Sequence, residues 1–334
     1  MTLLEIENLY LSFYTYAGEV QALRGINFQV NYGEAIGIVG ESGSGKSVSS
    51  LSIMGLLPPA GKIKSGRIAF EGRDLLTLSE KEMQQIRGNE ISMIFQDPMT
   101  SLNPVYTVGD QIMEPLMLHQ RLSRADAARK AVEMLTLTGM PDPERRFSQY
   151  PHEFSGGMRQ RAMIAMALSC RPKLLIADEP TTALDVTIQA QILHLMKDLK
   201  NHFNTSIIMI THDLGVVAEL CSRILVMYGG TIVEEGSAED IFYRPAHPYT
   251  RGLLRSIPDI RKADKEALLP IDGQPPDLLL PPPGCPFWPR CQHAMRICAE
   301  ERPGYHELDT GHRAACWLLH PSASHIEGGQ IIYE

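Results

Sequence analysis

The stretch that decides the fold is Gly40-Glu41-Ser42-Gly43-Ser44-Gly45-Lys46-Ser47, which reads G-x-x-x-x-G-K-S. The apolar run 35–39 before it is typical of a buried parallel strand, and residues 48–57 after it favour a helix. A phosphate-binding loop needs this context, because its glycines turn backbone N–H groups toward a polyphosphate at a helix N-terminus. Lys46 would then contact the β- and γ-phosphates, and the Ser47 hydroxyl would bind Mg²⁺. The alternative, a flexible Gly/Ser turn, leaves the flanking strand and helix unexplained.

Composition limits the class of protein. The chain has 334 residues, 44% of them hydrophobic, and a formal net charge of −8. The length allows a large core and more than one domain, and the acidic balance argues against a broad nucleic-acid-binding surface. No apolar run approaches the roughly 18 residues of a membrane span, and the N-terminus carries acids where a signal peptide carries bases. We therefore expect a soluble, cytoplasmic protein that does not bind nucleic acid.

Residues 3–30 alternate apolar and polar side chains, which predicts antiparallel strands. Phe13, Tyr14 and Tyr16 stand where the first of these strands ends. An aromatic ring at this place can stack on a nucleotide base or lie half-buried against the sheet. The sequence alone leaves both interpretations open.

The composition changes at residues 105–145, which are rich in Ala and Arg and mostly helical in pattern. We interpret this stretch as a helical subdomain inserted into an α/β core. Ser155-Gly156-Gly157 then precedes a helix without breakers, so it marks a second helix N-terminus that can attract an anion. A flexible N-cap without a ligand is the alternative.

Polar residues follow two further buried strands. Asp178 and Glu179 end the apolar run from 174, and His212 follows the run 206–210. Open α/β sheets bind ligands at the carboxyl ends of their strands. Adjacent strand residues point in opposite directions, so one acid can face Mg²⁺ while its neighbour addresses water. Capping of the next helix by the acids, and a purely structural histidine, are the alternatives.

Four of the six cysteines, Cys285, Cys291, Cys298 and Cys316, lie in the last fifty residues, after a proline-rich stretch. In a reducing compartment such a group indicates metal ligation rather than disulfides. The spacing is wider than in common zinc modules and differs from the ferredoxin patterns. Three options remain open: a four-iron, four-sulfur (4Fe–4S) cluster, a Cys₄ zinc site, or reduced structural thiols. Cys170 and Cys221 are expected to be buried small hydrophobes.

The order of these motifs resembles the ATPase subunit of an ABC transporter over about residues 3–240. The motifs that carry the resemblance are the phosphate loop, Gln96, Ser155-Gly156-Gly157, the pair Asp178-Glu179, Asp185 and His212. The signature here is Phe-Ser-Gly-Gly-Met, where the family's commonest form is Leu-Ser-Gly-Gly-Gln. Beyond it, residues 244–250 and the terminal cysteines resemble the C-terminal extension of oligopeptide and dipeptide importer ATPases, the dipeptide importers most of all.

The resemblance implies an α/β fold: a P-loop ABC ATPase core with an antiparallel β subdomain, an inserted helical subdomain and a small Cys-rich C-terminal module. We expect an ATPase domain at 1–258, with its helical subdomain at about 97–165. A Pro-rich linker at 259–284 and a Cys-rich metal-binding extension at 285–334 would follow.

The resemblance also implies roles for individual residues. Phe13 stands at the position of the adenine-stacking aromatic, with Tyr16 as second choice, and Gly40 to Ser47 hold the phosphates and Mg²⁺. Gln96 would link the metal and the attacking water to the helical subdomain. Asp178 would support Mg²⁺ through water, Glu179 would act as the general base, and His212 would contact the γ-phosphate. The signature residues Ser155, Gly156 and Gly157, with Asp185, belong to the same nucleotide site. The four C-terminal cysteines would hold a 4Fe–4S cluster, with Zn²⁺ as the alternative.

The implied assembly is a head-to-tail dimer in which the Lys46 loop of one subunit and Ser155 of the other enclose one ATP. We favour a heterodimer over a homodimer, at the cytoplasmic face of the membrane, with two permease subunits and, indirectly, a peptide-binding protein. An importer ATPase for another substrate such as nickel is one alternative. A soluble ABC ATPase is a second, although it would usually carry a coiled-coil insertion or tandem cassettes. A metal-sensing regulator is a third, and it leaves the ATPase motifs unexplained.

Overall fold

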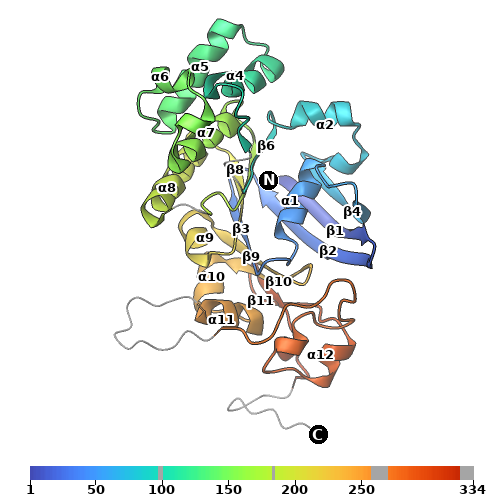
Figure 1. Ribbon diagram of the computed structural model, residues 1–334. Coiled ribbons are helices and arrows are strands. Elements are labelled where there is room, and N and C mark those ends of the chain that lie inside the picture. The colour runs from blue at the N-terminus through green and yellow to red at the C-terminus, as the bar shows by residue number, and fades with distance from the viewer. Residues whose placement is uncertain (97–100, 183–184, 257–269, 324–334) are drawn as a thin grey trace, which may run out of the picture.

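The computed structural model describes residues 1–96, 101–182, 185–256 and 270–323. Its strands form a four-stranded sheet in the order β2-β1-β4-β5 and an eight-stranded core sheet in the order β11-β12-β10-β9-β3-β8-β7-β6 (Figure 1). The strands are β1 (Thr2–Thr15), β2 (Gly18–Asn31), β3 (Ala35–Val39), β4 (Gly61–Phe70), β5 (Arg73–Asp74), β6 (Ile91–Ile94), β7 (Leu174–Asp178), β8 (Ser206–Thr211), β9 (Arg223–Tyr228), β10 (Thr231–Ser237), β11 (Tyr305–Asp309) and β12 (His312–Ala315).

The helices pack on these sheets and on one another. They are α1 (Lys46–Met54), α2 (Glu80–Ile86), α4 (Val108–His119), α5 (Arg124–Leu137), α6 (Pro143–Phe147), α7 (Gly156–Leu168), α8 (Val186–Phe203), α9 (Leu214–Leu220), α10 (Ala238–Tyr243), α11 (Pro248–Arg255) and α12 (Arg296–Glu300). No helix in the described ranges is long and apolar enough to cross a membrane.

Strand β3 separates two hydrophobic cores. Ile36 and Ile38 face a core that β1, β2, β4 and α1 complete, whereas Ala35 and Val39 face a second core with α7, α8 and α9. Alternate residues of a strand point to opposite faces, so a strand buried on both faces must be apolar throughout. The continuous apolar run before the phosphate loop therefore follows from its central place in the sheet, and the predicted buried strand is confirmed.

The expected antiparallel and helical parts are both present. β1 pairs antiparallel with β2 and β4, as the alternation predicts. Helices α4, α5 and α6 occupy 108–147 and contact α7 and one another, apart from the antiparallel sheet (Figure 1). Thr107 and Ser123 cap α4 and α5 by accepting hydrogen bonds from backbone N–H groups. The predicted helical insertion is thus confirmed in its described part.

The C-terminal extension is built onto the ATPase core. β12 pairs antiparallel with β10, and β11 pairs with β12, so the extension lengthens the core sheet by two strands. Cys285, Phe287 and Cys298 lie in the same hydrophobic core as β9 and α9. The described part of the extension therefore shares a hydrophobic core with the ATPase domain. Strands of four or five residues without clear alternation give too weak a pattern to predict this pairing.

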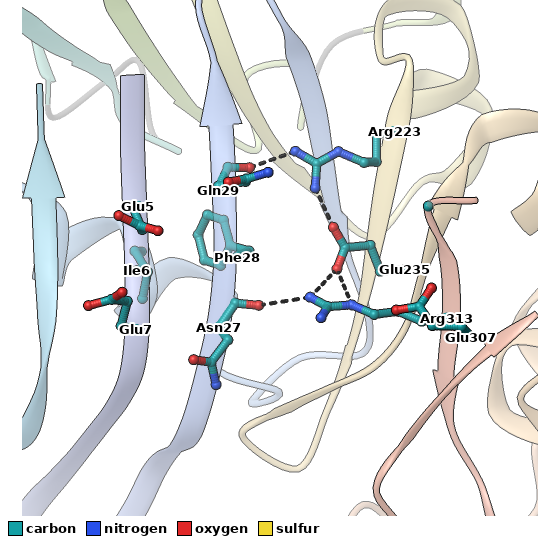
Figure 2. Close-up of a pocket in the computed structure, with 11 residues that line it drawn as sticks. Glu5, Ile6, Glu7, Asn27, Phe28, Gln29, Arg223, Glu235, Glu307 and Arg313 are labelled. Atoms are coloured by element: carbon teal, nitrogen blue, oxygen red, sulfur yellow. Dashed lines mark hydrogen bonds and ion pairs between the residues drawn. The ribbon is translucent and has the colours of Figure 1, made fainter. Parts of the chain in front are cut away.

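An ion-pair network joins three parts of the fold. Arg223 of β9 and Arg313 of β12 both donate to the carboxylate of Glu235 on β10 (Figure 2). Arg223 also donates to the backbone carbonyl of Gln29 on β2, at 2.6 Å. The network borders a cavity of about 510 Å³ between β2 and the core sheet. Because Arg223 is level with the first half of β3, this cavity lies at the opposite end of the strand from the phosphate loop.

Glu234 anchors the extension from inside. Its side chain is fully buried and accepts hydrogen bonds from the backbone N–H groups of Ala246 (2.7 Å) and His247 (2.9 Å) and from Nε2 of His312 (2.9 Å). One carboxylate therefore holds both the segment before α11 and the strand β12. A buried charge is tolerated only when its hydrogen-bonding capacity is met in this way.

We predict that Glu234→Ala lowers the free energy of unfolding by about 3 kcal/mol, because two buried N–H groups and His312 lose their acceptor. Urea unfolding of the full chain measures this change. Glu307→Ala is the control, since Glu307 lies exposed on β11 and its loss should cost less than about 0.5 kcal/mol. Equal midpoints for the two variants would contradict the anchoring role.

Candidate active site

The loop Gly40–Ser47 connects β3 to α1, as predicted, and two of its glycines are required by space. Gly40 and Gly45 have φ of 152° and 103°. A Cβ at Gly40 would lie 2.2 Å from the carbonyl oxygen of Met227, and one at Gly45 would lie 2.8 Å from that of Ala22. Backbone atoms cannot yield as side-chain tips can, so any larger residue would displace the loop. The loop is thus clamped between β2 and the end of β9.

Lys46 begins α1 and is buried. Its Nζ donates to the carbonyl oxygens of Gly40 at 2.7 Å and Glu41 at 2.9 Å. Burial lowers the pKa of Lys46, while the nearby charges of Glu179 and Asp178 act to raise it. The ammonium group therefore lies within the loop, held by the loop's own backbone.

Ser47 and Asp178 meet where a metal ion would be expected. The Ser47 hydroxyl donates to Oδ1 of Asp178 at 3.0 Å, joining the start of α1 to the end of β7. Burial raises the pKa of Asp178, and the charge of Glu179 adds to this effect against the hydrogen bond from Ser47. Hydroxyl and carboxylate oxygens are the donors that Mg²⁺ prefers, and a cation here would favour the charged carboxylate.

Two predicted residues, His212 and Gln96, converge on the carboxylate of a third, Glu179. Nδ1 of His212 lies 3.2 Å from Oε1 of Glu179, and Nε2 of Gln96 donates to Oε2 at 3.0 Å. The hydroxyl of Thr182, which sequence reasoning missed, donates to the same Oε2 at 2.9 Å. Glu179 itself has φ of 47°, in the left-handed region that is strained for a non-glycine residue and recurs at functional sites.

These contacts keep Glu179 ionised. Burial raises its pKa, but the hydrogen bonds from His212 and Thr182, with the charges of His212 and Lys46, hold it below the usual value. A carboxylate that is charged at neutral pH and partly desolvated can accept a proton from a positioned water. Asp178 and Glu179 are adjacent in sequence, yet their surroundings move their pKa values in opposite directions.

The signature residues do not join this group within one chain. Ser155 is exposed and caps α7 by accepting a hydrogen bond from the N–H of Met158, at 3.3 Å. Asp185 is exposed and caps α8 through the N–H of Ile188, at 2.9 Å. A side chain at Gly156 would meet open space. Ser155 and Gly156 therefore present an exposed helix N-terminus at α7, and Asp185 presents another at α8; helix N-termini attract anions.

The aromatic candidates differ in their surroundings. Phe13 is half-buried on β1 and lies so close to Gly61 that a Cβ there would be 2.9 Å from its ring. Tyr16 is fully exposed in the turn after β1, and Tyr14 lies beneath the ammonium of Lys62. Phe13 is thus the ring whose orientation is held by packing.

The four C-terminal cysteines come together as free thiols. All lie outside disulfides, and Cys285, Cys298 and Cys316 are buried. Burial raises the pKa of Cys285 to about 11 and that of Cys316 to about 12, and the neighbouring thiols add to both shifts. Within the described ranges, however, no group of three or more His, Cys, Asp or Glu side chains is arranged to hold a metal ion. The predicted metal site is therefore not borne out by this geometry. Cys170 and Cys221 are buried, as predicted.

Comparisons with known proteins agree with this arrangement. The family model "ABC transporter" matches residues 23–182, and "Oligopeptide/dipeptide transporter, C-terminal region" matches residues 233–298. The oligopeptide transport ATP-binding protein OppD of Bacillus subtilis is 59% identical over 99% of this chain and 92% of its own length. The dipeptide transport ATP-binding protein DppD of the same organism is 56% identical over 96% of both chains.

A solved structure has the same core. The ATP-binding cassette MJ0796, solved as a dimer in a post-hydrolysis state with ADP and phosphate, superposes with a TM-score of 0.64 at 28% identity. The match covers 71% of this chain and 99% of that one. Most of that cassette is therefore reproduced here, and close to a third of this chain lies outside the match.

Proposed function

The chain belongs to the ABC transporter family of ATPases, and from this premise we propose that it hydrolyses ATP to energise import of dipeptides and oligopeptides. The observation that carries the proposal is the hydrogen-bonded carboxylate of Glu179 beside Lys46 and the pair Ser47–Asp178. The chemistry needed is phosphoryl transfer to water, in which the protein supplies position and charge. The names of the relatives supply the substrate class.

The roles proposed for individual residues are those that the family resemblance implies, and the contacts described above support them. Lys46 would exchange its bonds to loop carbonyls for the β- and γ-phosphate oxygens, while Ser47 and Asp178 would hold Mg²⁺. Glu179 would accept the proton of the attacking water, and Gln96 and His212 would orient that carboxylate and the water beside the γ-phosphate. Phe13, held by its packing against Gly61, would stack on adenine at a lower entropic cost than the exposed Tyr16.

We predict that Glu179→Gln retains ATP binding but lowers hydrolysis about 100-fold or more, because the amide keeps the shape and removes the base. Hydrolysis is measured in the assembled transporter and binding on the full chain. Asp198→Asn, at an exposed position of α8, serves as the control. Hydrolysis by Glu179→Gln at close to the normal rate would remove Glu179 from this role.

The complete site is proposed to need two subunits. One chain offers two helix N-termini for phosphate, at Lys46 and at Ser155, but only one nucleotide loop. A head-to-tail pair would place Ser155, Gly156, Gly157 and Asp185 of one subunit over the nucleotide held by the Lys46 loop of the other. ATP would close this pair and hydrolysis would release it. We propose a second, related ATPase as the working partner, with a second copy of this chain as the alternative.

We predict that Ser155→Ala binds ATP normally as a monomer, because Ser155 bonds only within its own helix cap among the described contacts. The same variant should lose nucleotide-driven closure and hydrolysis in the assembled transporter. Lys46→Ala is the comparison, since it should lose ATP binding in the monomer. A loss of monomeric affinity in Ser155→Ala as large as in Lys46→Ala would show that Ser155 acts in its own chain.

The partners and location follow from the proposed function. Two transmembrane permease subunits would receive the motion through the helical subdomain that begins near Gln96. The chain would sit at the cytoplasmic face of the membrane, and a peptide-binding protein outside would deliver the substrate. The similarity of the whole chain to peptide transport proteins favours this function over a nickel importer or a soluble ABC ATPase.

We further propose that Cys285, Cys291, Cys298 and Cys316 hold a 4Fe–4S cluster. The four free thiols form a soft donor set, and neighbouring thiols add to the raised pKa values of Cys285, Cys291 and Cys316. Iron would supply positive charge that favours the thiolate forms. A single zinc ion needs four sulfurs at about 2.3 Å from one point. A 4Fe–4S cluster is larger than a single zinc ion, so the four thiols that bind it lie farther apart than the four sulfurs of a zinc site.

We predict that protein purified without oxygen is brown and contains about four iron and four sulfide per chain. Cys291→Ser should lose the colour and the iron, whereas Cys170→Ser, at a buried core position, should keep both. Colourless wild-type protein with one zinc and no iron, handled in the same way, would overturn the cluster assignment.

A further inference from the structure

The C-terminal extension reaches the phosphate loop at Glu41. The carboxylate of Glu41 receives two hydrogen bonds from the guanidinium of Arg290, Nη1 to Oε2 at 2.7 Å and Nη2 to Oε1 at 3.2 Å. The backbone N–H of Glu41 donates to the hydroxyl of Tyr249 at 2.9 Å. Its carbonyl oxygen accepts from Nζ of Lys46 at 2.9 Å. Glu41 is therefore held at its side chain, its N–H and its C=O.

Arg290 is itself immobilised. Its side chain is 5% exposed, and besides Glu41 it donates to the backbone carbonyls of Ile271 and Asp272 and to the hydroxyl of Tyr228. All five guanidinium N–H donors therefore have an acceptor. A guanidinium that is buried and has every N–H paired is held in one orientation. It can therefore fix the position of the Glu41 carboxylate as well as balance its charge.

The backbone around Arg290 is equally constrained. Arg290 ends the short helix η3 (Trp288–Arg290), which lies between Cys285 and Cys291. Within this turn Phe287 packs on the rings of Tyr228 and Tyr249, with centroids 5.2 and 5.3 Å away. The two tyrosines that contact Arg290 and Glu41 are thus packed on the same ring. The extension, β9 and α11 form one rigid support beneath the loop.

We infer that Arg290 is a positioning residue for ATP binding, acting through Glu41 on the phosphate loop and Lys46. It touches no nucleotide itself, and this inference rests on the proposed function. With Arg290 in place, the side chain of Glu41 is fixed, so the backbone of the loop is preformed before ATP arrives. Without Arg290, the ordering of the loop must be supplied by the binding of ATP, which weakens affinity.

The test is ATP binding to the full chain, with KM and kcat measured in the assembled transporter. Arg290→Gln should raise Kd and KM for ATP about tenfold and leave kcat within about threefold, since a preformed loop assists ground state and transition state alike. Arg290→Lys should recover part of the affinity, because it keeps the charge and loses the fork. Arg296→Gln, which removes an exposed ion pair in the same extension, is the control and should bind ATP normally.

A double-mutant cycle separates positioning from a general loss of structure. Glu41→Gln should also raise Kd for ATP, and the double variant with Arg290→Gln should be no more than about twofold weaker than the weaker single variant. Fully multiplicative effects would show that the two residues act separately and would overturn the inference. So would wild-type Kd and KM in Arg290→Gln.

Glu41→Gln and Arg290→Lys carry the test if Arg290→Gln does not fold. Glu41→Gln leaves the bonds from Arg290 to the carbonyls of Ile271 and Asp272 in place, and Arg290→Lys keeps the positive charge. Wild-type ATP affinity in both variants would also overturn the inference. Failure of the wild-type protein to bind ATP would instead contradict the proposed function, so the two failures are distinguishable.

Discussion

The parallel register of β3, β7 and β8 is the constraint on which the site depends. Val39 lies level with Thr211, and Asp178 lies level with Ile210, so three strands end at one edge of the sheet. The residues that follow those ends are the phosphate loop, Glu179 and His212. Parallel neighbours cannot be joined by tight turns, so each of these segments arrives from a distant part of the chain. The hydrogen-bond ladder of the sheet thus brings the Ser47 hydroxyl within 3.0 Å of Asp178 and the His212 ring within 3.2 Å of Glu179.

Buried or partly buried charged side chains of both signs lie at the carboxyl ends of these strands: Lys46, Asp178 and Glu179. Burial lowers the pKa of Lys46 and raises the pKa of Asp178, so it disfavours the charged form of both side chains. Burial also acts to raise the pKa of Glu179, but hydrogen bonds from His212 and Thr182, with the charges of His212 and Lys46, hold it below its usual value. Buried charges of both signs, with few solvent contacts, are costly unless other charges join them. A polyphosphate for Lys46 and a divalent cation for Asp178 would supply those charges, which is why the site is suited to both together.

Local sequence patterns predict the residues at the carboxyl ends of these strands. They do not predict contacts between residues that lie far apart in the chain. The strand, loop and helix around Gly40–Ser47, and the acids after β7, could be read because each signal lies within about ten residues of sequence. The contact between Glu41 and Arg290 could not, because it spans 249 residues and a lone arginine carries no pattern. The same holds for Thr182, an ordinary loop residue until the fold places it on Glu179. The sequence does not predict the pairing of β12 with β10, because only two pairs of residues define its register and so short a ladder leaves no pattern in the sequence.

Arg290 is synthesised long after the phosphate loop that it supports, and this order has a consequence for folding during translation. The phosphate loop is synthesised early relative to its neighbours: Tyr249 and Arg290 follow Glu41 by 208 and 249 residues. A nascent chain that stops before residue 290 has the whole glycine-rich motif without the guanidinium that holds Glu41. Domains generally fold as units during synthesis, and here the unit closes only when the extension has been made. If Arg290 preforms the loop as inferred, full ATP affinity is reached only after residue 290 has been made, later than the loop, Glu179 and His212 themselves.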